Sequence, residues 1–189
     1  MKKKHYTPLD LVRTLMKGKN TKLNIENLAL DGAESTMQPS ASVRSMILAK
    51  IEKLNEQARN RQSISLEDLP ILNENANWLD WEAAVVGIEP PDEFDNIHLH
   101  PLESNDNRDL FLTFVKEIVP EEVHHDLIES ILLLDGTCEC HIWTESGNKQ
   151  LVRMQAGDYI EMKIGEIHDI YITSAQPAKA ILQWLKVAA

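Results

Sequence analysis

Two stretches of the sequence decide the fold. The first is Glu122-Val123-His124-His125-Asp126-Leu127-Ile128-Glu129, with Gly136 following after six further residues, and the second begins at Gly157 and ends in Lys163-Ile164-Gly165-Glu166-Ile167-His168. Both combine imidazole and carboxylate groups, which suit zinc, iron or manganese. Side chains alternate across a strand, so Glu122 and His124 share one face and His125 points to the other. Ligands this far apart in the sequence can converge only if the fold brings their strands together.

Short alternating segments surround the two stretches. Turn clusters at roughly ten-residue spacing separate them, and this predicts an antiparallel sandwich or barrel of some eight strands. The predicted strands are Ile97–Leu99, Leu110–Val119, Ile128–Leu134, Cys138–Thr144, Lys149–Met154, Tyr159–Met162, Ile167–Thr173 and Ala178–Val187.

The N-terminal third has helical periodicity instead. We expect short helical pieces near residues 7–18 and 22–31 and a longer helix at about 40–60. The polar, Asn-rich stretch 61–77 is typical of a linker, and strand character is expected from Trp78 onward. The predicted organisation is a helical region at 1–62, a linker and lead-in at 63–89, and a β domain at 90–189.

Composition narrows the class of protein. Of its 189 residues, 43% are hydrophobic and 26% charged, which fits a globular chain. No apolar run approaches the ~20 residues that cross a bilayer, and the basic N-terminus lacks the apolar segment of a secretory signal. The two cysteines, Cys138 and Cys140, make no disulfide framework. We therefore expect a cytoplasmic protein with no membrane partner.

The net charge of −11 is unevenly divided. Residues 1–62 hold 12 Lys and Arg against 6 Asp and Glu, whereas residues 63–189 hold 7 against 24. The acidic part argues against direct nucleic-acid binding. A basic helical region beside an acidic domain indicates two units with different partners, or two units that attract each other.

The two quoted stretches resemble the paired motifs of the cupin superfamily, whose small jelly-roll barrels hold a metal between them. Glu129, Gly136, Gly157, Gly165 and His168 fall on the family pattern. The resemblance covers about residues 95–187. It implies a mostly β protein with a single cupin barrel after a small helical region. Glu122 stands where the family has its first His, and Lys163 replaces a Pro.

The resemblance also implies a metal site. Two registers of the first motif are open: His124 as a ligand keeps Glu122 beside it, whereas His125 leaves Val123 there, which cannot bind metal. The first register keeps more ligands and gives the set Glu122, His124, Glu129 and His168. The alternatives for His125 are that it is a ligand instead of His124 or that it lies next to the ligands without binding the metal. The expected cofactor is a divalent transition metal, zinc before iron or manganese.

Other candidate groups have simpler interpretations. His98 and His100 are expected as surface or core polar residues, His141 as an exterior residue, and Cys138 and Cys140 as small buried side chains. Thiol ligation or redox sensing is the alternative for the two cysteines.

The order of helices, linker and barrel is similar to the ChrR-type anti-sigma factors. That resemblance implies a regulator whose barrel senses a signal and whose helices bind a sigma factor. The helical region contains no Cys, so the zinc of that family's helical domain is absent. The alternative is a small metal-dependent cupin enzyme of the dioxygenase or isomerase type. A second copy of the chain, bound through the outer strands of the barrel, is a further expected partner.

Overall fold

The described part of the chain forms a β-sandwich preceded by helix. The computed structural model describes residues 40–144 and 147–187, with nine strands and two helices. The helices are α2 (Ala41–Arg59) and α3 (Trp78–Ala84). The strands are β1 (Ile97–Ser104), β2 (Arg108–Val115), β3 (Ile118–Val123), β4 (Leu127–Asp135), β5 (Thr137–Trp143), β6 (Lys149–Gln155), β7 (Tyr159–Met162), β8 (Ile167–Ile172) and β9 (Ala178–Lys186).

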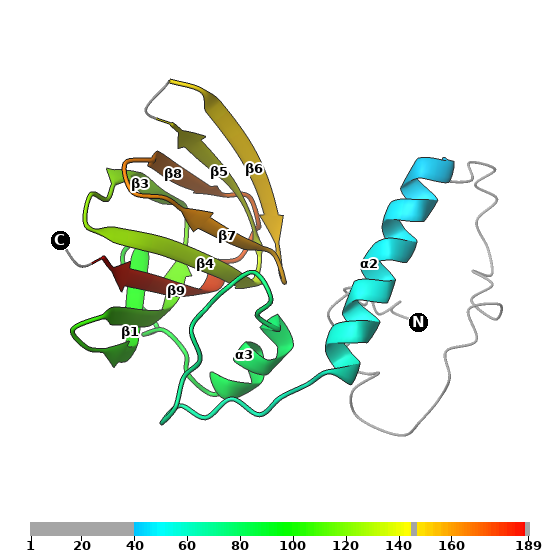
Figure 1. Ribbon diagram of the computed structural model, residues 1–189, viewed down its shortest axis with the longest axis horizontal. Helices are drawn as coiled ribbons and strands as arrows, with labels where there is room; N and C mark the ends of the chain where they lie inside the picture. The colour runs from blue at the N-terminus through cyan, green and yellow to red at the C-terminus, as the bar shows by residue number, and fades with distance from the viewer. Residues whose placement is uncertain (1–39, 145–146, 188–189) are drawn as a thin grey trace. The chain divides into compact units, whose positions relative to one another are not determined.

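The strands form two facing antiparallel sheets (Figure 1). The five-stranded sheet has the order β1-β2-β9-β4-β7, and the four-stranded sheet has the order β3-β8-β5-β6. Neighbouring strands are distant in sequence, and the chain crosses repeatedly between the sheets, which is the topology of a jelly roll. The predicted fold class, a mostly β jelly roll after a helical region, is confirmed.

Most of the predicted elements are present, with two differences. The expected strand Leu110–Val119 is two strands, because the chain turns at Lys116 and Glu117 and passes from one sheet to the other. The expected strand character from Trp78 is wrong, because residues 78–84 form helix α3. Asn77 caps this helix, and its side chain accepts a hydrogen bond from the Leu79 N–H. The expected helical pieces near 7–18 and 22–31 lie outside the described residues.

The five-stranded sheet is covered on its outer face. Residues expected to act as a linker, together with α3, pack there against alternate side chains of β2, β4 and β9. Gln183 of β9 holds this covering segment in place through two hydrogen bonds. Its amide oxygen accepts from the Leu72 N–H at 2.9 Å, and its amide nitrogen donates to the Leu72 carbonyl at 3.1 Å. The covering residues are Leu69, Leu72, Trp78, Leu79, Trp81 and Val85.

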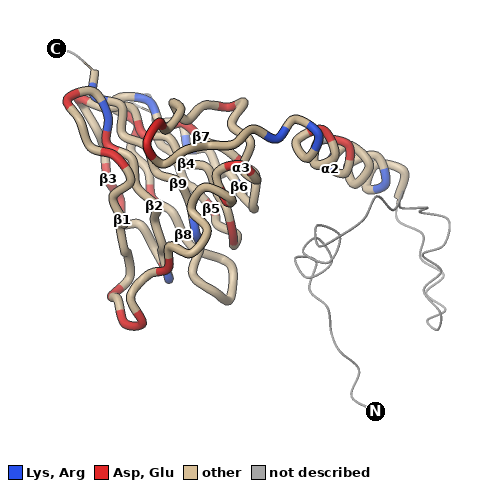
Figure 2. The backbone as a smooth tube through the Cα atoms, turned by 90° about the horizontal axis from the view of Figure 1, so that it is seen from below, with Lys and Arg blue, Asp and Glu red and all other residues tan. Residues whose placement is uncertain are grey.

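A second apolar core lies between the two sheets, where the opposite side chains of β4 and β9 meet those of β5, β6 and β8. Strand β4 is therefore buried on both faces, which explains its continuous apolar run Ile131–Leu134. Acidic residues are spread over the strands and loops of the sandwich, whereas α2 carries both signs (Figure 2). Among the described residues, no helix is long and apolar enough to span a membrane.

Candidate metal centre

Strand pairing brings the candidate ligands together. Glu122 on β3 lies directly opposite His168 on β8, and Glu129 on β4 lies opposite Trp184 on β9. His124 follows β3, and its carbonyl accepts a hydrogen bond from Gly165, which fixes it against the β7–β8 turn. Three residues of the stretch 122–129 thus meet His168, which comes much later in the sequence, between the two sheets, as the predicted barrel requires.

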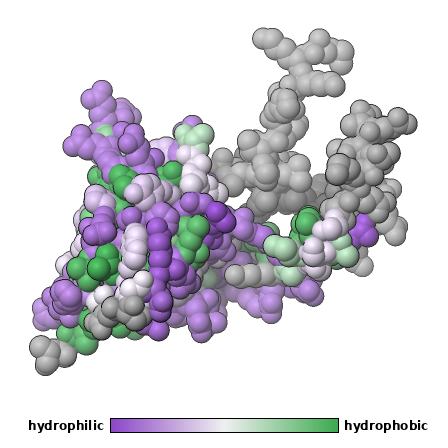
Figure 3. Space-filling view, turned by 90° about the horizontal axis from the view of Figure 1, so that it is seen from above, coloured by the Kyte–Doolittle hydropathy of each residue, from purple (hydrophilic) through white to green (hydrophobic). Residues whose placement is uncertain are grey.

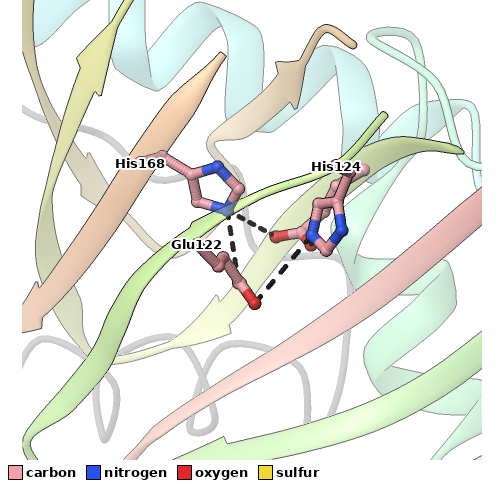
Figure 4. A group of neighbouring side chains, drawn as sticks. Glu122, His124 and His168 are labelled. Atoms are coloured by element: carbon pink, nitrogen blue, oxygen red, sulfur yellow. Dashed lines mark hydrogen bonds and ion pairs between the residues drawn. The ribbon is translucent and has the colours of Figure 1, made fainter. Parts of the chain in front are cut away.

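The four side chains form a compact group. One ligand atom from each of Glu122, His124, Glu129 and His168 lies within 4.8 Å of the others. The side chains of Glu122, His124 and His168 point toward one another (Figure 4). His125 is exposed and is not part of this cluster. The structure therefore assembles the register that retains Glu122 and His124.

Glu129 is the most heavily bonded carboxylate of the group. Its Oε2 accepts from Trp184 Nε1 at 2.8 Å and lies 3.0 Å from His124 Nε2. Burial alone would raise the pKa of Glu129, but His168, Trp184 and His124 together lower it. Glu129 is therefore ionised. The contact with Trp184, which orients this carboxylate, could not be predicted from the local sequence pattern.

His168 has a buried ring nitrogen without a hydrogen-bond partner. Its Nε2 lies 3.3 Å from Glu122 Oε1 and 3.4 Å from Glu129 Oε1, yet no described group meets it with hydrogen-bond geometry. Burial favours the neutral ring, but the two facing carboxylates outweigh it and raise the pKa of His168 to about 10. An unpartnered imidazole nitrogen facing two carboxylates is the arrangement that a metal ion completes.

The turn that carries His168 accommodates its departure from the family pattern. Lys163 stands where a Pro is expected, and its N–H, which a Pro would lack, donates to Glu166 Oε2 at 2.8 Å. The Glu166 N–H donates to the Lys163 carbonyl at 3.0 Å and closes the turn. The substitution therefore leaves the position of His168 intact.

A cavity of about 200 Å³ lies between the sheets beside the cluster. Its lining is mostly aliphatic, with Glu122, Glu129 and the unpartnered hydroxyl of Thr113 as polar exceptions. Cys138 and Cys140 are buried there, as predicted. The hydrogen bond between the two thiols lowers the pKa of Cys138 and raises that of Cys140.

The remaining candidate residues lie away from the cluster. His98 points to the other face of β1 from the cavity and contacts the rings of Phe94 and Phe114. His141 lies on the outer side of β5, where its Nδ1 is 2.8 Å from Asp169 Oδ1. In the described part of the chain, neither belongs to a cluster of metal-ligand type.

The two sheets have the strand orders of a jelly roll, and a His/Glu cluster lies between them. Both features agree with the architecture expected from the sequence. The fold is cupin-like. No protein-family model and no curated protein matches the sequence. Specific support for a ChrR-type relationship is absent from these comparisons.

Three solved structures with a similar fold share little sequence with this chain. The cupin domain of Cnp3 from Schizosaccharomyces pombe is 13% identical, covering 53% of this chain and 74% of that one with a TM-score of 0.45. A cupin superfamily protein from Desulfitobacterium hafniense is 17% identical, with coverages of 53% and 84% and a TM-score of 0.43. A putative mannose-6-phosphate isomerase from Ralstonia eutropha is 12% identical, with coverages of 55% and 95% and a TM-score of 0.47. At these values the likeness carries no argument about activity.

Proposed function

We propose that this protein is a metal-dependent regulator whose cluster of Glu122, His124, Glu129 and His168 binds one divalent transition metal ion. The observation that carries the proposal is the buried His168 Nε2, which has no hydrogen-bond partner and lies 3.3 and 3.4 Å from two carboxylate oxygens. Two imidazoles and two carboxylates suit zinc, iron or manganese. When bound, such an ion would supply a Lewis acid with coordination positions for a further ligand.

The cavity beside the cluster supports a sensing role. Both sheets line it, and Glu122 and Glu129 contribute to its wall, so a small molecule there would lie close to the metal ligands. Its largely apolar lining favours a signal molecule with an apolar body. The proposed signal acts by occupying this space beside the metal.

The helical region is the proposed partner-binding part. Apolar side chains of α2 are exposed within the described residues, and some are visible among hydrophilic ones (Figure 3). An exposed apolar helix face favours association. By the anti-sigma resemblance the proposed partner is a sigma factor, and a homodimer is the competing occupant. The exposed residues are Val43, Met46, Ile47, Leu48 and Ile51.

A metal-dependent enzyme is the second candidate, and the same cavity favours it, because a substrate could enter beside the metal. Among the described residues, however, the lining contains no Lys or Arg to hold an anionic substrate. Beyond Glu122 and Glu129 of the cluster itself, the described lining also contains no carboxylate or imidazole. The regulatory function is therefore the better supported of the two.

Metal analysis of the purified full chain tests the metal site. We expect about one equivalent of zinc, iron or manganese per chain, and a loss of most of it in His168→Asn. The exposed His125 provides the matched control, and His125→Asn should retain the metal. Absence of metal after reconstitution of the wild type, or equal metal content in His168→Asn, would contradict the proposal.

Binding of purified sigma factors from the host, with and without metal, tests the regulatory role. Ile47→Asp with Ile51→Asp should abolish complex formation, whereas Asn55→Asp, also exposed on α2, adds charge without removing apolar surface. A metal-loaded protein that binds no sigma factor but transforms small molecules at a rate lost in His168→Asn would favour the enzyme.

A further inference from the structure

Three sulfur-bearing side chains line the cavity from neighbouring strands. Cys138 and Cys140 share one face of β5, and Met154 on β6 lies directly opposite Cys138 in the antiparallel register. Each side chain is at most 4% exposed. Cys140 Sγ lies 3.7 Å from Met154 Sδ. The cluster at Glu122, His124, Glu129 and His168 does not use any of these atoms.

The sulfur spacing has the geometry of a metal site. If a metal ion lies about 2.3 Å from each of two sulfurs that are 3.7 Å apart, the S–metal–S angle is about 107°. That angle is close to tetrahedral, so Cys140 and Met154 could bind one ion without moving apart. Cys138 is two residues before Cys140 on β5 and lies opposite Met154 on β6, so its thiol is the third sulfur on this part of the cavity wall.

A disulfide explains the pair less well. Both cysteines are free thiols. Residues two apart on a strand have side chains that leave the backbone in the same direction about 6.6 Å apart, whereas a disulfide needs Cβ atoms about 3.5–4.5 Å apart. The Cβ atoms on β5 are therefore too far apart for a disulfide of about 2.05 Å, whereas two sulfurs that each lie about 2.3 Å from a shared ion can be up to about 4.6 Å apart.

We propose that Cys138, Cys140 and Met154 form a second metal site that binds a soft monovalent ion, Cu(I) being the physiological representative. Thiolate and thioether sulfurs select Cu(I) over hard cations. The surroundings are aliphatic, with Ile170 and Ile172 among the lining residues of the neighbouring strand β8. An apolar wall favours an ion whose binding adds no charge.

The charge balance agrees with a monovalent ion. One Cu(I) ion binds as one thiol releases its proton to solvent, so a sulfur–copper bond replaces a sulfur–hydrogen bond and no electrons are transferred. The net charge of the cavity is unchanged, because one cysteine binds as the thiolate, Met154 is a neutral thioether donor and the second thiol keeps its proton beside the ion.

Competition between the reduced, metal-free full chain and a chromophoric Cu(I) chelator under anaerobic conditions tests the site. The wild type should retain one Cu(I) per chain. Cys138→Ser and Cys140→Ser should each weaken binding at least about tenfold, as should Met154→Leu, which preserves volume. His168→Asn is the matched control, because it removes a ligand of the other cluster and should leave Cu(I) affinity unchanged.

X-ray absorption of the copper-loaded wild type keeps the test independent of how the variants fold. Sulfur neighbours alone around copper are expected. Nitrogen or oxygen neighbours, a loss of copper binding in His168→Asn, or copper retained undiminished by the double cysteine variant would overturn the proposal. Failure of the wild type to compete with the chelator would do so as well. Zinc binding at the His/Glu cluster is measured separately and does not decide this outcome.

Discussion

Glu129 is the residue through which the candidate metal centre is connected to the five-stranded sheet. It is 2% exposed, and its Oε2 is held by the indole of Trp184 and lies beside His124. A carboxylate with this many neighbours is already oriented before a metal ion binds. Orientation of this kind reduces the entropy lost when the ion is bound.

Replacement of Glu129 by Gln should therefore remove metal affinity without removing the shape of the site. The amide oxygen can still accept from Trp184, but the negative charge is lost. We expect zinc affinity to fall by at least about 100-fold, since even groups that only orient metal ligands contribute 10–100-fold. Isothermal titration of zinc into the metal-free protein measures it, with His125→Gln as the control of unchanged affinity. Equal affinities in the two variants would exclude Glu129 as a ligand.

The pKa of His168 gives metal binding a definite pH dependence. Because this pKa is raised to about 10 in the folded chain, metal must displace a proton across the range below that value. We expect zinc affinity to increase about tenfold per pH unit between pH 6.5 and 8 from this group alone. An affinity that is flat over this range would show that His168 is not the proton that metal replaces.

The same group has the opposite effect on the metal-free protein. A folded-state pKa above the unfolded value of 6.5 means that the stabilisation is complete below pH 6.5. It is lost as the pH rises through about 10. The melting temperature of the metal-free chain should therefore fall over this range relative to that of His168→Asn, and the increase caused by zinc should be larger at pH 8 than at pH 6.5.

At the scale of elements, two motif glycines explain why the family pattern could be recognised from sequence. Gly157 has a φ of +89°, and a Cβ there would lie 2.8 Å from Trp78 Cδ1. Gly136 has a φ of +91°, and a Cβ would lie 3.0 Å from the Ala178 backbone. Each glycine combines a left-handed conformation with a close approach, so no other residue fits.

Gly147 provides the comparison for Gly157, since it has a φ of +77° with nothing within 4 Å of the position that a Cβ would take. We expect Gly147→Ala to cost about 1 kcal/mol of unfolding free energy through backbone conformation alone. Gly157→Ala should cost roughly 2–4 kcal/mol, because overpacking against Trp78 is added. Chemical denaturation measures both, and equal losses would mean that the contact with Trp78 is accommodated without strain.

The hydrogen bonds of Gln183 fasten the cover to strand β9. Gln183→Met keeps the volume but leaves the buried N–H and carbonyl of Leu72 unpaired. We expect a loss of about 2–4 kcal/mol in unfolding free energy, given roughly 1–3 kcal/mol for each unsatisfied group. Gln150→Met on exposed β6 should change it by less than about 0.5 kcal/mol. A loss in Gln183→Met no larger than in this control would mean that the cover is held by apolar packing alone.

The strands were largely predictable because alternation and turn residues are local signals. Ile128–Leu134 and Tyr159–Met162 match β4 and β7 closely. Helix α3 was not, because its seven residues are too short for helical periodicity and its apolar side chains are explained only by the sheet that they cover. The segment 61–77 was misleading in the same way. Its composition is that of a linker, but Leu69 and Leu72 are buried because they pack against the sheet.

The sequence indicated which residues would form the candidate cluster, but not how they are arranged. Spacing placed Glu122 and His124 on one face, and the structure brings them to His168. Trp184 carries no sequence signal for its role, since its indole meets Glu129 only through the pairing of β4 with β9. The cavity likewise arises from the facing of two sheets, which no local pattern encodes.

At the scale of the whole molecule, a barrel that begins at residue 90 is incomplete, because it lacks the segment that covers the five-stranded sheet. A chain trimmed to 90–189 would expose Leu110, Leu112 and Leu132, which are fully buried in the intact protein. We expect it to aggregate, whereas a chain of 60–189 keeps the cover and should remain dispersed. Light scattering and circular dichroism of both compare them. A dispersed, β-rich 90–189 with undiminished stability would contradict this.

The four tryptophans give the molecule two independent optical signals. Trp78 and Trp81 are buried in the cover, so their fluorescence should shift to longer wavelength when the cover opens. Trp184 donates its indole N–H to Glu129, so a cation bound by that carboxylate should alter its emission. With Trp78, Trp81 and Trp143 each replaced by Phe, the light emitted by a single indole would follow the state of Glu129, and no attached dye would be required.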